Sequence, residues 1–295
     1  MFKNVLVGVD GSPNGRDAIG LASLLTGPDG RLTLAHVRPG KHHPLHAITP
    51  ALLAEEGDAS EQLLERERAL AQVSADLISI VSTIPGRGLH RHAEDLNADL
   101  LVVGSCSHGV FGRTVLGDDT RAALNGAPCA VAIAARGYAE HPAPIAGIGV
   151  GYNRSRESEA ALELARTLAA ATRATVEAVE VVSMPSYGFV EAGGEYLNRM
   201  LTDANNRMKE LSGVDGRAVY GGAGEQLAAL SDNVDLLVVG SRSYGPVRRL
   251  VLGSTCDYLE RHARCSLLVL PRLAIHGTTD SERDAAAAST AAPAI

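Results

Sequence analysis

The chain has 295 residues, 45% of them hydrophobic, and a formal net charge of −7 at pH 7. This length is enough for about two domains, each with its own core. An acidic chain with 3% aromatic residues and no Trp offers neither a basic face nor rings on which bases could stack, so nucleic-acid binding is disfavoured. No apolar run approaches the ~18 residues of a membrane span, and the apolar start of the chain predicts a strand rather than a signal peptide. The four cysteines lack zinc-type spacing, so we expect reduced thiols and a cytoplasmic location.

In the first half of the chain, short apolar runs alternate with amphipathic stretches. The apolar runs predict strands at residues 5–9, 31–37, 77–84, 99–105 and 129–134. The stretches between them predict helices at residues 60–73 and 88–96, one starting at Pro13 with Ser12 as its N-cap, and one starting near Thr120. Strands made of solid Val, Leu and Ile runs indicate a parallel sheet covered by helices on both faces. Ligands of such sheets bind at the carboxyl ends of the strands.

The second half of the chain repeats the first. Residues 101–117 read LVVGSCSHGVFGRTVLG and residues 237–253 read LVVGSRSYGPVRRLVLG, while VGVDGSPNGRDAIGLA from Val7 aligns with VGYNRSRESEAALELA from Val150. We therefore predict two tandem Rossmann-like α/β domains, each a five-stranded parallel sheet, with another α/β layering as the alternative. The predicted boundaries are 1–136 and 145–273 for the domains, 137–144 for a linker and 274–295 for a disordered tail.

The strand that ends in Asp10-Gly11-Ser12, together with the glycine-rich stretch after the fourth strand, resembles the universal stress protein family over residues 2–272. The form is a tandem two-domain one, as in actinobacteria. The resemblance implies an adenine nucleotide alpha hydrolase-like fold, and ATP or another adenine nucleotide as ligand, with Mg²⁺ only alongside ATP. It also implies that the halves pack as a pseudo-dimer through their last strands, and it allows two chains to associate as a homodimer.

The resemblance also implies which residues hold the nucleotide. The family's loop, Gly-x2-Gly-x9-Gly-(Ser/Thr), holds the phosphates, the Asp after the first strand lies at the adenosine end, and the backbone after the second strand faces the adenine. In the first copy the loop positions are Gly104, Ser107 and Gly117, followed by Asp118, and the adenosine-end positions are Asp10 and Val37. In the second copy the loop positions are Gly240, Ser243, Gly253 and Ser254, and the adenosine-end positions are Asn153 and Val181. Both copies therefore depart from the family's pattern, at opposite ends of the site.

The distribution of charge makes the second copy the better candidate for binding the nucleotide. Asp118 and Asp119 place carboxylates where a triphosphate would rest in the first copy, although Asp118 could equally serve only as a helix cap. In the second copy Ser254 is predicted to be the N-cap, with Asp257 as its capping-box partner. Positive charge surrounds that loop at Arg242, Arg248 and Arg249, for which a purely solvated loop is the alternative.

The sequence thus predicts a regulatory protein of the stress response that binds an adenine nucleotide, with the stronger site in the second half. The alternative is a nucleotide-free regulatory or scaffold module with degenerate sites. No catalytic constellation is visible, so we predict no enzyme beyond a weak, incidental ATPase. His42, His43 and His46 suggest a segment near the ligand edge more than a metal site, and Cys106 in the first loop leaves a redox role open.

Overall fold

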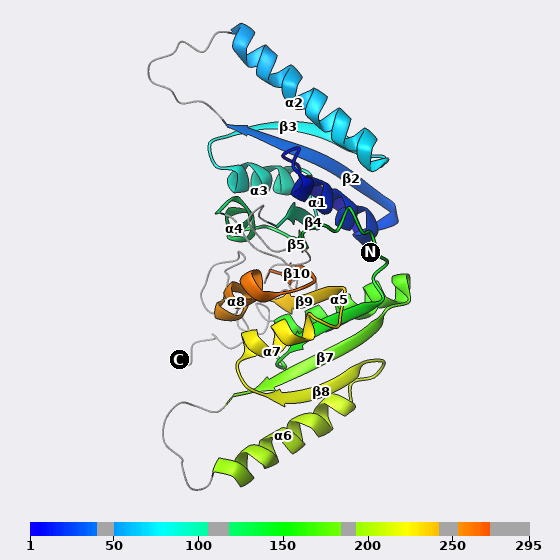
Figure 1. Ribbon diagram of the computed structural model, residues 1–295, viewed down its shortest axis with the longest axis vertical. Coiled ribbons are helices and arrows are strands. Elements are labelled where there is room, and N and C mark those ends of the chain that lie inside the picture. The colour runs from blue at the N-terminus through cyan, green and yellow to red at the C-terminus, as the bar shows by residue number, and fades with distance from the viewer. Residues whose placement is uncertain (40–49, 106–117, 184–192, 242–252, 272–295) are drawn as a thin grey trace, which may run out of the picture.

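The computed structural model describes residues 1–39, 50–105, 118–183, 193–241 and 253–271, which form one 10-stranded sheet with helices on both faces (Figure 1). The strand order is β3-β2-β1-β4-β5-β10-β9-β6-β7-β8. Every neighbouring pair is parallel except β5 and β10, which meet antiparallel at the centre. The α/β, Rossmann-like class predicted from the sequence is confirmed.

The two halves contribute equal sets of described elements. The first half contains β1 (Phe2–Gly8), α1 (Pro13–Leu25), β2 (Thr26–Pro39), α2 (Pro50–Ala71), β3 (Asp76–Ser82), α3 (Pro85–Asp95), β4 (Leu100–Gly104), α4 (Asp118–Leu124) and β5 (Ala130–Ala134). The second half contains β6 (Gly147–Tyr152), α5 (Arg156–Thr172), β7 (Thr175–Val182), α6 (Gly193–Lys209), β8 (Asp215–Tyr220), α7 (Ala223–Leu230), β9 (Leu236–Gly240), α8 (Ser254–His262) and β10 (Ser266–Leu270). Helices α2 and α6 lie at opposite ends of the long axis (Figure 1).

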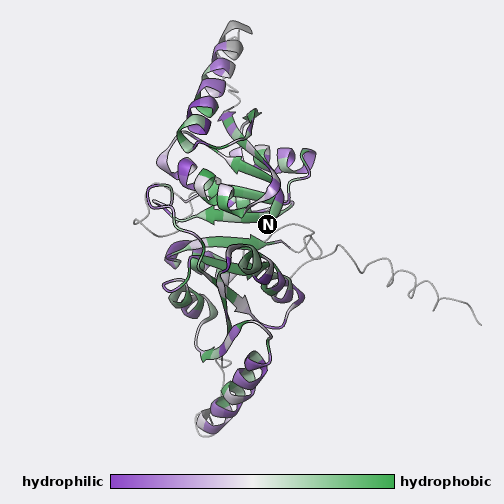
Figure 2. Cartoon of the chain, turned by 90° about the vertical axis from the view of Figure 1, so that its right-hand side faces the viewer, coloured by the Kyte–Doolittle hydropathy of each residue, from purple (hydrophilic) through white to green (hydrophobic). Residues whose placement is uncertain are grey.

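Two hydrophobic clusters fill the two faces of the sheet. Along β1, Val5 and Val7 belong to one cluster and Leu6 to the other, because successive side chains of a strand point to opposite faces. The first cluster includes residues of α1, α2, α5 and α6, and the second includes residues of α3, α4, α7 and α8. Apolar residues accordingly concentrate in the strands and polar residues on the outer faces of the helices (Figure 2). None of the helices in the described part of the chain is long and apolar enough to span a membrane.

The helices and strands discussed next are of the predicted type, but several begin at other residues than predicted. Ser12 is the N-cap of α1, where its Oγ accepts a hydrogen bond from the Gly15 backbone N–H at 3.3 Å. Helix α2 begins at Pro50 rather than at residue 60, and α4 begins at Asp118 rather than near Thr120. Strand β2 begins at Thr26 rather than at residue 31, because Thr26 pairs with Phe2 of β1. Pairing with a neighbouring strand thus extends β2 through residues whose own sequence favours a turn.

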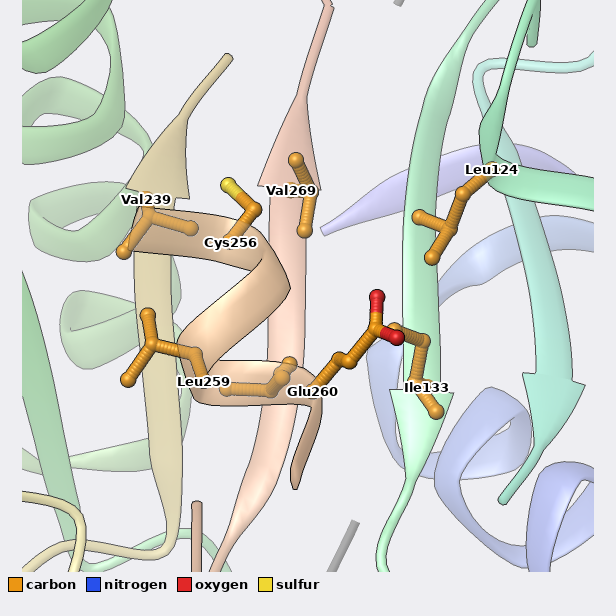
Figure 3. Close-up of a pocket in the computed structure, with 8 residues that line it drawn as sticks. Leu124, Ile133, Val239, Cys256, Leu259, Glu260 and Val269 are labelled. Carbon is orange, nitrogen blue, oxygen red and sulfur yellow. The ribbon is translucent and has the colours of Figure 1, made fainter. Parts of the chain in front are cut away.

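At the centre of the sheet, the two halves meet with near two-fold symmetry. Ala132 of β5 pairs with Leu268 of β10, which is its own counterpart in the repeat. Helices α4 and α8 lie beside this junction, and Figure 3 shows the Glu260 carboxylate pointing from α8 toward Ile133 of β5. A cavity of only about 10 Å³ remains there, so the junction is closely packed. Arg121 of α4 forms an ion pair with Glu260 across it.

Candidate functional site

The second half contains a pocket at the carboxyl ends of β6, β7 and β9, where the sequence predicts the ligand to bind. Its volume is about 440 Å³, within the range of ~300–1,000 Å³ typical of small-molecule sites. Four of the predicted site residues line it together: Asn153, Val181, Gly240 and Gly253. They come from four separate segments of the chain, which only the parallel sheet brings to one edge.

The wall of this pocket has an apolar side and a polar side. Val179, Val181, Leu227 and Val239 offer apolar surface on which a flat base could pack. Hydroxyl and amide groups and one carboxylate line the polar side: Asn153, Ser155, Ser158, Ser241, Thr255 and Glu157. This combination suits a ligand with an apolar ring and a polyhydroxylated or phosphorylated part.

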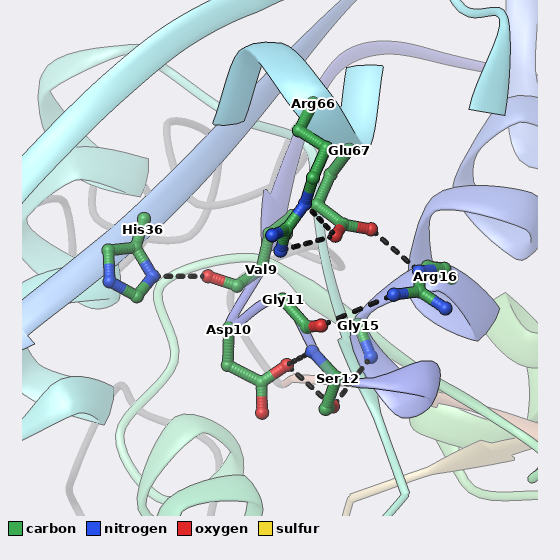
Figure 4. A network of polar contacts seen from close by, with 9 residues as sticks. All are labelled: Val9, Asp10, Gly11, Ser12, Gly15, Arg16, His36, Arg66 and Glu67. Carbon is green, nitrogen blue, oxygen red and sulfur yellow. Dashed lines mark hydrogen bonds and ion pairs between the residues drawn. The ribbon is translucent and has the colours of Figure 1, made fainter. Parts of the chain in front are cut away.

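The segment after the first strand of each half forms the same turn around a different residue. In the first half, Asp10 Oδ1 accepts hydrogen bonds from the Ser12 backbone N–H at 3.0 Å and from the Ser12 hydroxyl at 2.6 Å (Figure 4). In the second half, Asn153 Oδ1 accepts from the Ser155 backbone N–H at 3.1 Å. The exchange of Asp for Asn therefore preserves this turn, since either side chain supplies the accepting oxygen.

The residue inside this turn is left-handed in both halves. Gly11 has φ of +78° and Arg154 has φ of +62°. Glycine adopts this conformation at no steric cost, whereas Arg154 does so against its intrinsic preference. Its Nε lies 3.6 Å from Glu180 Oε1, and Arg207 reaches the same oxygen at 3.2 Å. The ion pair between Arg154 and the buried Glu180 carboxylate helps to hold the turn.

The first glycine of each loop is required by packing, whether or not a ligand is present. A Cβ atom added to Gly104 would lie 2.2 Å from the backbone oxygen of Asn14, and one added to Gly240 would lie 2.6 Å from Cβ of Glu157. Both distances are far below a van der Waals contact. The strands β4 and β9 can therefore approach the first turns of α1 and α5 only because they end in glycine.

A polar network absent from the sequence-based site supports the first-half turn (Figure 4). His36 Nδ1 donates a hydrogen bond to the Val9 backbone oxygen at 2.8 Å. Glu67 of α2 is fully buried and accepts from Arg16 Nε of α1 at 2.8 Å and from Arg66 at 3.0 Å. The hydrogen bond to Glu67 raises the pKa of Arg16. Nothing in the local sequence marks Glu67 as buried, since it lies within an otherwise charged helical stretch.

The prediction of Ser254 as an N-cap is wrong. Gly253 occupies the N-cap position of α8, with φ −90° and ψ 167°, and Ser254 is the first helical residue. Asp257 is not a capping-box partner, because it lies four residues after an N-cap glycine that has no side chain; its carboxylate lies 3.8 Å from the Arg121 guanidinium of the first half. The N-cap residue Gly253 has no side chain, so it makes no side-chain capping hydrogen bond to α8.

Some of the predicted site residues lie in the described part of the chain, and others lie outside it. In the first half, Asp10, Val37 and Gly104 lie at or just beyond the carboxyl ends of the neighbouring strands β1, β2 and β4. The remaining predicted positions fall outside the described residues: Ser107, Gly117, Arg242, Ser243, Arg248, Arg249, Cys106, His42, His43, His46 and the tail 274–295. Among the residues that are described, no cluster of three or more His, Cys, Asp or Glu side chains could hold a metal ion.

Comparison with known proteins agrees with the fold of this chain. A universal stress protein of Mycobacterium tuberculosis is 28% identical over 223 residues, which cover 72% of this chain and 77% of that protein. The crystal structure of a universal stress protein from Archaeoglobus fulgidus has a TM-score of 0.66 at 17% identity, covering 91% of this chain and 98% of that one. A protein of unknown function from Pseudomonas aeruginosa has a TM-score of 0.63 at 15% identity, covering 93% and 94%.

The sequence model of the Universal stress protein family matches the chain twice, at residues 1–135 and 146–271. These two matches include all the strands described above. The chain therefore belongs to the universal stress protein family, with one copy of the family's domain in each half.

Proposed function

We propose that this protein is a regulatory protein of the stress response that binds an adenine nucleotide in the pocket of its second half. The observation that carries the proposal is the meeting of Asn153, Val181, Gly240 and Gly253 around one pocket of suitable volume. Its apolar side fits adenine, and its hydroxyl-lined side fits ribose and phosphate.

The start of α8 supplies the anion-binding part of this proposal. Helix α8 follows Gly253 directly, and Thr255 of its first turn lines the pocket. Its N-cap residue has no side chain to compete for the first N–H groups, and the positive end of its dipole favours a phosphate. By contrast, Ser12 and Ser155 already cap α1 and α5. The start of α8 is therefore the better position for phosphate.

The first half is proposed to bind nucleotide weakly or not at all. Its helix α4 begins with two acidic residues, Asp118 and Asp119, at the position where α8 has Ser254 and Thr255. Negative charge at the positive end of a helix dipole satisfies that end and repels a phosphate. We further propose that the halves act as one cytoplasmic unit, with domains at 1–136 and 145–273, which the pairing of β5 with β10 supports.

Two measurements test the proposal. The protein has no Trp, so co-purified nucleotide should be conspicuous in the ultraviolet spectrum of a filtrate collected after denaturation. Titration calorimetry with ATP, AMP and cyclic AMP should then show binding that Gly253→Val abolishes, because the added side chain takes up space in the pocket wall beside the start of α8. The matched substitution in the first half, Gly117→Val, should leave affinity unchanged. If Gly117→Val abolishes binding and Gly253→Val does not, the site is in the other half. If neither nucleotide nor heat of binding is found, the nucleotide-free scaffold function replaces this one.

A further inference from the structure

Position 157 is the structural counterpart of position 14, and the two carry different chemistry. The backbone and Cβ of Glu157 lie directly beneath Gly240, as those of Asn14 lie beneath Gly104. Likewise Asp10 and Asn153 are counterparts, because each forms the turn to the following serine. Each half thus has one acid and one amide at these two positions, in opposite order. The carboxylate that the second half lacks after β6 recurs one helical turn later.

Glu157 is buried, yet nothing in the described structure pairs with its carboxylate. The residue is 7% exposed and lines the pocket from the first turn of α5. Among the described residues its carboxylate has neither a hydrogen-bond donor nor an ion-pair partner. The carboxylate oxygens are not sealed from water but are open to the pocket. The oxygens are therefore available to accept a hydrogen bond from a ligand of the pocket.

An adenine nucleotide offers donors at two places, the amino group of adenine and the hydroxyls of ribose. The apolar residues that suit adenine, Val179, Val181 and Leu227, come from β7 and α7. Glu157 comes from α5 and packs beneath Gly240 of β9. In the sheet, β9 lies between β10, which follows α8, and the strands β6 and β7. In a nucleotide, ribose joins the base to the phosphates. The position of Glu157 between those two parts of the pocket therefore matches ribose.

We propose that Glu157 is a specificity-determining residue that accepts a hydrogen bond from a ribose hydroxyl of the ligand. This proposal rests on adenine-nucleotide binding in the second-half pocket and adds the residue that selects the sugar. It makes the pocket selective for ribosides, because a ligand without these hydroxyls displaces water from the carboxylate and offers it no donor in return. In the first half Asn14 carries no charge, so discrimination of this kind is confined to the second half.

The test is a cycle of protein and ligand changes measured by titration calorimetry. The ligands are adenosine and 2′,3′-dideoxyadenosine, which differ only in the hydroxyls. The proteins are the wild type, Glu157→Gln, Glu157→Met and the control Glu163→Gln, which changes an exposed carboxylate of the same helix. Gln keeps an accepting oxygen without charge, and Met keeps the length of the side chain without an acceptor.

Wild type and Glu163→Gln should prefer adenosine by about ten-fold or more, as expected for a hydrogen bond to a charged group. The preference should fall to a few-fold in Glu157→Gln and vanish in Glu157→Met. An equal preference in wild type and Glu157→Met would overturn the assignment. So would adenosine binding that requires Mg²⁺ in the wild type but not in Glu157→Met, because the carboxylate would then hold a cation. If no protein binds adenosine, ATP, AMP or cyclic AMP, the proposed function itself fails and this inference falls with it.

Discussion

Removing the guanidinium of Arg121 should destabilise the protein by leaving a buried carboxylate of the other half without its cation. Arg121 pairs with Glu260, whose side chain is 2% exposed, and with Asp257 at 3.8 Å. Breaking a buried ion pair by removing one partner costs about 3–5 kcal/mol. The Arg121 side chain is 39% exposed, so water reaches the cationic side of the pair. We therefore expect Arg121→Ala to lower the free energy of unfolding by about 3 kcal/mol, the lower end of that range.

The repeat itself supplies the rescuing substitution. Leu124 occupies in α4 the position that Glu260 occupies in α8, so the same junction accepts a leucine on its other side. Replacing a buried ion pair by apolar residues is often neutral or stabilising. Arg121→Ala combined with Glu260→Leu should therefore recover most of the lost stability.

Urea denaturation followed by far-ultraviolet circular dichroism measures both changes, and Arg264→Ala is the control. Arg264 pairs with Asp232 at 3.0 Å where both side chains are solvent-accessible, so its removal should cost less than about 1 kcal/mol. The reasoning is refuted if Arg121→Ala costs no more than the control. It is also refuted if the double variant is no more stable than Arg121→Ala alone.

Three further predictions concern packing and titration. Gly240→Ala should lower the free energy of unfolding by about 1–3 kcal/mol, because the new Cβ meets Glu157 at 2.6 Å. The control Gly194→Ala places its Cβ in open space and should not lower the free energy of unfolding. Equal effects of the two substitutions in urea denaturation would contradict this. Burial, with the charge of Asp235, raises the pKa of Tyr138 from 10.0 to about 12, so its contribution to stability is complete below pH 10 and is lost as the pH rises to 12. Tyr138→Phe should make that loss shallower in denaturation curves across this range, and an unchanged slope would count against it. Burial also raises the pKa of Cys129 to about 12. Iodoacetamide near pH 8 should therefore modify this thiol only in denaturant. If peptide mass spectrometry shows modification in the native protein, Cys129 is not buried.

The sequence was sufficient for the fold because its signals were local and repeated. The strands are uninterrupted apolar runs, and the match between residues 101–117 and 237–253 established the duplication. The start of β2 could not be predicted, since residues 26–30 read TGPDG and favour a turn. Their strand conformation depends on pairing with β1, and an added Cβ at Gly30 would lie 2.8 Å from the Phe2 backbone oxygen.

The site was less accessible from the sequence, because its chemistry depends on which side chains the sheet buries. The residues that family motifs mark, such as Asn153 and Gly240, were predicted and do line the pocket. Glu157 was not predicted, because it lies in the polar stretch SRESEA, which is typical of an exposed helix, although the residue is buried. Its burial follows from the absence of a side chain at Gly240, a residue distant in sequence. The cap of α8 was mistaken because Ser254 is a favoured N-cap residue, whereas Gly253 already has the extended conformation that an N-cap requires.

The divergence of the two copies also determines which domain pairs with which. The central strands meet about a near two-fold axis, so any contact across it has a counterpart with the copies exchanged. Across the junction, Arg121 pairs with Glu260. In the repeat, Asp257 corresponds to Arg121 and Leu124 corresponds to Glu260. Two first-half domains paired in this way would set each arginine against a leucine, and two second-half domains would set Asp257 against Glu260, carboxylate against carboxylate. Only the combination of a first half with a second half forms the ion pair and avoids the repulsion, so charge at this junction favours pairing of the unlike halves.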